Sequence, residues 1–143
     1  MNDPAAEAGS PNNGDQHMTE PSWHRLDLFR RRIERRVEKL IADAVTAGNI
    51  EMIRDGRIRL AALRFAFEGS VEAHQQLRAF HSEDRRPLSV SDLQSILAIV
   101  EEPGVRDGTA LGVVNPSPDD AREFVFHVSA FVWAFQNGAA LRP

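Results

Sequence analysis

Glu123 and His127 are the residues whose types and spacing come nearest to catalytic chemistry. They stand four residues apart in a segment predicted to be helical, so their side chains share one face, with Asp120 on the same side. A carboxylate beside an imidazole can transfer protons or supply part of a metal-ligand set. Ordinary structural roles explain the same residues better, because Asp120 lies where acids cap a helix start and His127 suits the polar edge of a buried helix.

Two further histidines, His74 and His81, stand two turns apart on another predicted helix. This spacing is too long for both rings to bind one ion unaided, and neither HExxH nor Glu-x-x-His is present. The absence of cysteine excludes thiol catalysis, thiolate zinc sites and iron–sulfur clusters. We therefore predict no catalytic residue, no cofactor and no metal site. A small enzyme of unfamiliar type, built around His74 and His81 or around Glu123 and His127, is the least favoured function.

A row of cations lies opposite the apolar stripe of the first predicted helix. Such an array can bind phosphates or an acidic protein surface. An acidic stripe that includes Asp27 and Glu34 runs beside it, so a solvated face with the i,i+4 pairs Asp27–Arg31 and Arg30–Glu34 is the first interpretation. An anionic partner, including nucleic acid, is the alternative. The candidate anion-binding residues are Arg31, Arg32, Arg35, Arg36 and Lys39.

Charge is distributed unevenly along the 143 residues, whose net charge is −4. Residues 1–20 contain four acids and no Lys or Arg. Residues 21–64 carry 11 basic and 6 acidic residues, whereas residues 65–143 carry 6 basic and 11 acidic residues. These opposite charges favour pairing between the two halves over an anionic partner for the first half.

Hydrophobic residues make up 42% of the chain, too many for a fully disordered protein. No apolar run approaches the ~20 residues of a membrane span, and the polar, acidic start has no signal-peptide hydrophobic region. We therefore expect a cytoplasmic protein without membrane contact. Residues 1–20 are expected to be a disordered acidic tail, and residues 21–143 a single helical domain.

The first part of this domain combines a clear helix with an ambiguous segment. An apolar stripe with helical spacing predicts a helix over 21–47, ending at Gly48. Residues 50–67 fit either a short β-hairpin around Asp55-Gly56 or a helix, and our compromise is a strand or turn up to Gly56 followed by a helix over 57–67. The stripe of the first helix is Leu26, Phe29, Ile33, Val37, Leu40 and Ala44.

Serine caps predict the remaining helices. Ser70 begins a helix over 71–82, and Ser89 with Asp92 forms a capping box for a helix that ends near 102. A glycine-containing loop follows, with a short strand as one option at residues 111–114. Residues 117–120 (Ser-Pro-Asp-Asp) then give the clearest helix start in the chain.

The last helix, predicted over 118–137, is apolar on two faces. Its main stripe includes Phe124, Val125 and Val128, while Phe126 and Trp133 form a second stripe. A helix of this kind lies centrally in its domain or at a subunit contact. Phe126 and Trp133 are therefore candidates for self-association.

The sequence predicts a mainly α protein, a single compact bundle of four to five helices, with a short β-hairpin near residues 50–60 as an option. The preferred function is a non-catalytic regulatory protein that binds a protein partner through helix surfaces. A nucleic-acid-binding regulator using the arginine-rich face is the alternative, and homo-oligomerisation is a secondary hypothesis. No motif set identifies a family.

Overall fold

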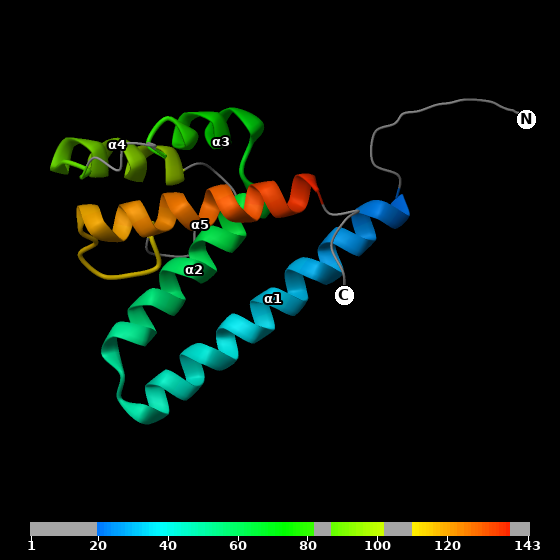
Figure 1. The fold of residues 1–143 in the computed structure, drawn as a ribbon, viewed down its shortest axis with the longest axis horizontal. Coiled ribbons are helices and arrows are strands. Elements are labelled where there is room, and N and C mark those ends of the chain that lie inside the picture. The colour runs from blue at the N-terminus through cyan, green and yellow to red at the C-terminus, as the bar shows by residue number, and fades with distance from the viewer. Residues whose placement is uncertain (1–19, 82–86, 102–109, 138–143) are drawn as a thin grey trace, which may run out of the picture.

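Five helices make up most of the computed structural model, which describes residues 20–81, 87–101 and 110–137. They are α1 (Glu20–Ala47), α2 (Ile50–Glu68), α3 (Val71–Arg78), α4 (Val90–Val100) and α5 (Pro118–Gln136). These residues contain no strand, and the predicted helical bundle is confirmed (Figure 1). No helix in this part of the chain is apolar over a length that could cross a bilayer. Residues 1–19 of the predicted tail lie outside the described residues.

α2 is one continuous helix, so the predicted turn or hairpin near residues 50–60 is wrong. Asn49 explains the start of α2, because its side chain accepts a hydrogen bond from the Met52 amide at 3.1 Å. Gly56, which with Asp55 resembles a hairpin turn, lies inside α2 where α1 comes close. A Cβ on Gly56 would stand 2.6 Å from Ile41 Cγ1. This glycine therefore permits close helix packing rather than a turn.

α1 and α2 form an antiparallel helical hairpin along one side of the molecule (Figure 1). α1 ends as predicted before Gly48, whose φ of 69° is readily adopted by glycine. Along the predicted stripe Val37 and Ala44 are buried, but Leu40 is 43% exposed. The predicted stripe is therefore wrong at Leu40. The close approach at Gly56 explains the difference, because it places Ile41, rather than Leu40, against α2.

Serine caps begin α3, α4 and α5 where the sequence predicted them. Ser70 caps α3, while Ser89 with Asp92 and Ser117 with Asp120 form complete capping boxes at α4 and α5. In each box the serine side chain accepts from the aspartate amide, and the aspartate side chain accepts from the serine amide. α3 ends four residues before its predicted end.

The segment that leads into α5 has turns and bends where a strand was an option at residues 111–114. Leu111 and Val113 are buried in the core. Between them, Gly112 has a φ of 76°, and a Cβ there would stand 2.6 Å from the Arg57 carbonyl oxygen. The segment therefore packs directly on α2. The preceding loop residues, 102–109, lie outside the described residues.

α5 lies centrally, as predicted, and contacts α2, α3 and α4 (Figure 1). An ion pair reinforces its packing on α2, with Arg54 Nε donating to Asp120 Oδ1 at 3.1 Å. This pair joins the two oppositely charged halves of the chain. α1 packs on α2 outside the main core. The largest fully buried side chains of that core are Ile58, Phe65, Leu77, Ile96, Leu111 and Phe124.

Candidate interaction surfaces

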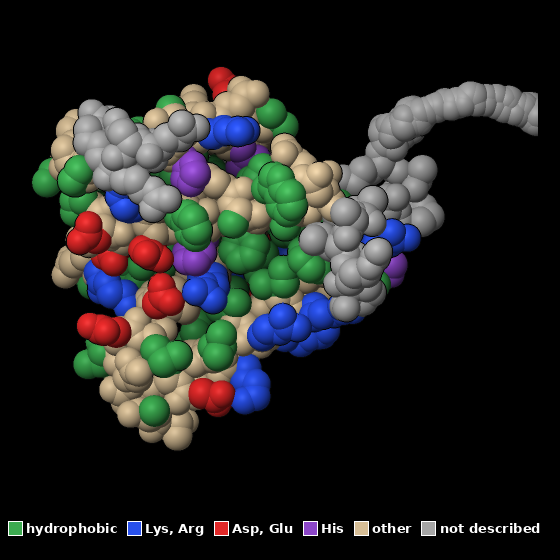
Figure 2. All heavy atoms as spheres, in the orientation of Figure 1, with side chains coloured by type: hydrophobic (Ala, Val, Ile, Leu, Met, Phe, Trp, Pro, Cys, Tyr) green, Lys and Arg blue, Asp and Glu red, His purple; other side chains and the backbone are tan. Residues whose placement is uncertain are grey.

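The five cations predicted to bind anions are all exposed on α1, and Figure 2 shows Lys and Arg side chains gathered along this helix. Helical spacing places them together because they occur at intervals of three and four residues. We call this set the α1 cationic face: Arg31, Arg32, Arg35, Arg36 and Lys39.

Acids on α1 neutralise only part of the α1 cationic face. The Nε of Arg31 lies 3.1 Å from Asp27, as predicted, and the Nζ of Lys39 lies 2.9 Å from Asp43. The other three members make no ion pair with the described residues. Within the described residues, the guanidinium groups of these three arginines therefore have no neutralising acid.

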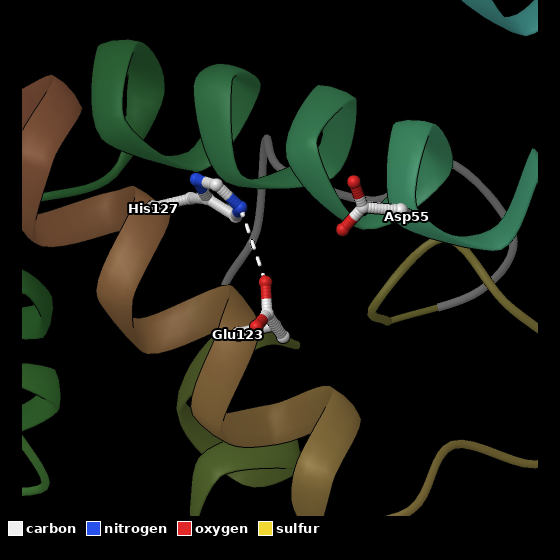
Figure 3. A group of neighbouring side chains, drawn as sticks. All are labelled: Asp55, Glu123 and His127. Atoms are coloured by element: carbon white, nitrogen blue, oxygen red, sulfur yellow. Dashed lines mark ion pairs between the residues drawn. The ribbon is translucent and has the colours of Figure 1, made fainter. Parts of the chain in front are cut away.

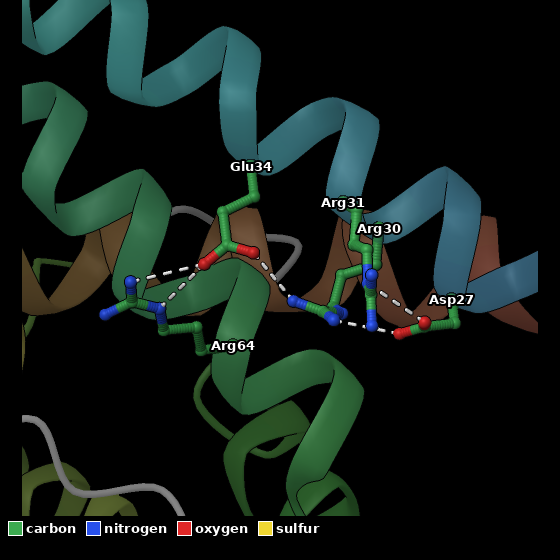
Figure 4. Close-up of polar contacts among 5 residues, drawn as sticks. All are labelled: Asp27, Arg30, Arg31, Glu34 and Arg64. Carbon is green, nitrogen blue, oxygen red and sulfur yellow. Dashed lines mark hydrogen bonds and ion pairs between the residues drawn. The ribbon is translucent and has the colours of Figure 1, made fainter.

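A second set of arginines is committed to holding α1 against α2 (Figure 4). Glu34 on α1 lies 2.7 Å from the Nη1 of Arg30, as predicted, and 3.2 Å from the Nη2 of Arg64 on α2. The Arg30 guanidinium also lies 4.9 Å from the centroid of the Phe67 ring, within cation–π range. Its hydrogen bond is the main cause of a lowered pKa at Asp27. The charges of Arg30 and Arg64 are therefore used inside the fold.

A groove of about 330 Å³, lined by both apolar and polar side chains, runs between α3 and α5. Leu77 and Val128 are almost completely buried at its floor, whereas Val71 and Trp133 are 72% and 63% exposed at its rim. We call it the α3–α5 groove, and its other lining residues are His74, Gln75, Arg78, His81, Ser129, Val132 and Gln136.

The two aromatic residues predicted for self-association are both exposed on α5. Phe126 is 55% exposed, and its ring stacks on His81 with centroids 6.2 Å apart. Trp133 stands two turns further along at the rim of the α3–α5 groove. Figure 2 shows hydrophobic and histidine side chains gathered over this part of the molecule. Large exposed aromatic side chains in one region are typical of interaction surfaces.

His74 also has a structural role beneath the α3–α5 groove. Its Nε2 lies 3.1 Å from the Phe65 carbonyl oxygen near the end of α2, and its ring meets the Phe65 ring nearly edge-on. The Gly69 amide donates to the same carbonyl at 2.8 Å. His74 thus ties α3 to α2. His81, which follows the end of α3, lines the same groove as His74.

Glu123 and His127 do lie together, with 3.4 Å between the Glu123 Oε1 and the His127 Nε2. Burial and the nearby Arg59 charge lower the pKa of His127, which keeps the imidazole neutral near pH 7. Asp55 of α2 is the third member of this cluster. It is the residue that sequence reasoning missed, because no local pattern shows that α2 lies beside this face of α5.

Asp120, by contrast, is taken up by the ion pair with Arg54 and by the cap of α5. Burial raises the pKa of Asp120, but the hydrogen bonds from Arg54 and Ser117 outweigh it, and the net shift is downward. Asp120 therefore stays ionised at neutral pH and has a structural role.

No known protein family, curated protein or solved structure significantly matches the chain.

Proposed function

We propose that this protein is a non-catalytic, cytoplasmic regulatory module that binds a protein partner through the α3–α5 groove. The observation that carries the proposal is the exposed indole of Trp133 at the rim of this groove, beside the buried side chains of Leu77 and Val128. Tryptophan is enriched among the residues that dominate binding energy at protein interfaces. Removing such a side chain from water contributes about 2 kcal/mol.

The groove shape favours an apolar segment presented by a helix. Two helices form its walls, and a third amphipathic helix can place one row of apolar side chains between them. Arg78, His81 and Gln136 at the rim offer polar contacts around this centre. The partner expected from this chemistry is an amphipathic helix with a large apolar residue that packs beside Trp133.

Affinity capture from native cell extract tests the proposal. The bait is the full chain, compared with Trp133→Ala and with Val45→Ala, which removes an exposed apolar side chain from α1. We expect a protein retained by wild type and Val45→Ala and lost with Trp133→Ala, in nuclease-treated extract as well. Retention of the same proteins by Trp133→Ala would contradict the proposed groove.

The secondary hypothesis, self-association, uses the same aromatic residues. Sedimentation of wild type and a Phe126→Ala/Trp133→Ala variant distinguishes a second copy from a different partner. A wild-type dimer that the double variant converts to monomer would make another copy the occupant. A wild-type monomer at high micromolar concentration would remove self-association.

Nucleic-acid binding is the second candidate function, favoured by the three arginines of the α1 cationic face that make no ion pair with the described residues. The affinity for duplex DNA or RNA should then fall as the salt concentration rises. A plot of the logarithm of the binding constant against the logarithm of the salt concentration should have a slope near −3 for about three phosphate contacts. Arg32→Ala/Arg35→Ala should weaken binding, whereas the control Arg57→Ala/Arg78→Ala, with the same charge change at exposed sites outside that face, should not. No duplex binding at low salt would eliminate this candidate.

A further inference from the structure

Three side chains of types that can bind a metal ion lie close together between α2 and α5, outside the α3–α5 groove (Figure 3). Asp55 comes from α2, whereas Glu123 and His127 project from successive turns of α5. One ligand atom from each lies within 4.8 Å of the others. In a tetrahedral zinc site, metal–ligand bonds of about 2.1 Å place ligand atoms about 3.4 Å apart. The His127–Glu123 distance of 3.4 Å already matches that spacing.

His127 supplies the second observation. Among the described residues, its buried Nε2 has no hydrogen-bond partner. The distance of 3.4 Å to Glu123 Oε1 is too long for a well-formed hydrogen bond. Buried polar nitrogens in folded proteins are nearly always satisfied, so this atom requires a partner. A metal ion held between the imidazole and the two carboxylates would provide one.

We propose that Asp55, Glu123 and His127 form a binding site for a divalent transition-metal ion, with zinc as the preferred occupant. An imidazole with two carboxylates suits zinc or a neighbouring transition metal, whereas magnesium and calcium prefer all-oxygen sites. Three protein ligands leave the fourth position to water. Glu123 and Asp55 are about half exposed, so an ion can enter from solvent.

When no metal is bound, the positive charge of Arg59 partly balances the negative charges of the site. It lies one turn after Asp55 on α2, with 3.5 Å between its Nη2 and the Asp55 Oδ2. Its side chain is 38% exposed, so it can turn toward solvent when a cation takes its place. Arg59 therefore competes with the metal, and its removal should affect affinity in the opposite direction to removal of a ligand.

Calorimetric titration of the full chain with zinc chloride tests the site, with magnesium chloride as the comparison. We expect one equivalent of zinc to bind at this site and magnesium not to bind. Asp55→Asn and Glu123→Gln should each weaken zinc affinity by at least about tenfold, whereas Arg59→Gln should strengthen it several-fold. The matched control, Asp119→Asn, removes an exposed acid from the same helix and should leave the affinity within about twofold.

Nitrogen NMR of the histidine rings identifies the liganding imidazole, and zinc should shift the His127 resonance in wild type. Asp55→Asn and Glu123→Gln change surface-exposed groups, so circular dichroism should show both folded. Absence of zinc binding by folded wild type, or unchanged zinc affinity in both variants, would overturn the proposal. Neither result bears on Trp133, so the proposed partner binding is tested separately.

Discussion

α1 and α5 each expose one long face, and the two faces differ in the free energy of exposing their side chains to water. The α1 cationic face consists of side chains that are normally solvated, so it is stable without a partner. The outer face of α5 leaves Phe126 and Trp133 more than half exposed. Apolar area that stays in water contributes nothing to folding and lowers solubility. The aromatic face of α5, rather than the charged face of α1, is therefore the stronger evidence for a binding partner.

α1 and α5 also differ in how much they contribute to the main hydrophobic core. α5 contributes Phe124 to the main core, whereas α1 packs on α2 outside it. Phe124→Ala should therefore lower the free energy of unfolding by about 3–5 kcal/mol, and Val37→Ala on α1 by only about 1–2 kcal/mol. Urea denaturation measures both. Equal losses would show that α1 is as much a part of the core as α5.

The α1–α2 contact can be tested at Gly56. Alanine has a helix propensity about 1 kcal/mol better than glycine, but at this site its Cβ would meet Ile41 Cγ1 at 2.6 Å. We expect Gly56→Ala to destabilise the protein by about 1–2 kcal/mol. In an Ile41→Ala background the same change should become neutral or stabilising. A stabilising Gly56→Ala in wild type would contradict the close helix approach.

Acid denaturation probes the Arg54–Asp120 contact that attaches α5 to α2. Because the folded-state pKa of Asp120 is lowered, its stabilisation is present above the unfolded pKa of about 3.9 and is lost as pH falls through the folded value. Asp120→Asn should cost about 1–2 kcal/mol at pH 7 through the cap and the partly exposed ion pair.

The difference between wild type and Asp120→Asn should shrink as the pH falls from about 5 to 2. Urea denaturation at a series of pH values measures it, with Asp119→Asn as the control. A difference that stays constant with pH would show that the Asp120 carboxylate charge does not contribute.

The smallest effect on stability is expected on the exposed aromatic face of α5. Trp133→Ala should change the free energy of unfolding by less than about 0.5 kcal/mol, because surface substitutions seldom do more. Thermal denaturation checks this. A large loss would assign Trp133 to packing within the fold and weaken its interpretation as a binding residue.

Local signals predicted the parts of this fold that depend on local chemistry. The Ser89–Asp92 and Ser117–Asp120 boxes satisfy backbone amides of their own first turns, so they are readable from four residues of sequence. Asp55-Gly56 failed as a signal because the same dipeptide serves a hairpin turn or a close helix contact. Only the position of Ile41 on a neighbouring helix distinguishes the two.

The candidate surfaces also contain a part that could be predicted from local sequence and a part that could not. Helical spacing was sufficient to place the α1 cationic face and to bring Phe126 and Trp133 to one side of α5. It could not predict that Val71 and Leu77 of α3 line the same groove as Trp133, or that Asp55 lies beside His127. These residues come from other helices, and their positions depend on how the helices pack.

The most direct test of partner binding is a calorimetric comparison of three chains against the captured protein, at about 50 and 200 mM salt. We predict that Trp133→Ala weakens affinity by at least about tenfold at both salt concentrations, while Arg32→Ala/Arg35→Ala stays within about twofold of wild type. Full affinity in Trp133→Ala, with a steep, salt-dependent loss in the arginine variant, would contradict the account and assign binding to α1.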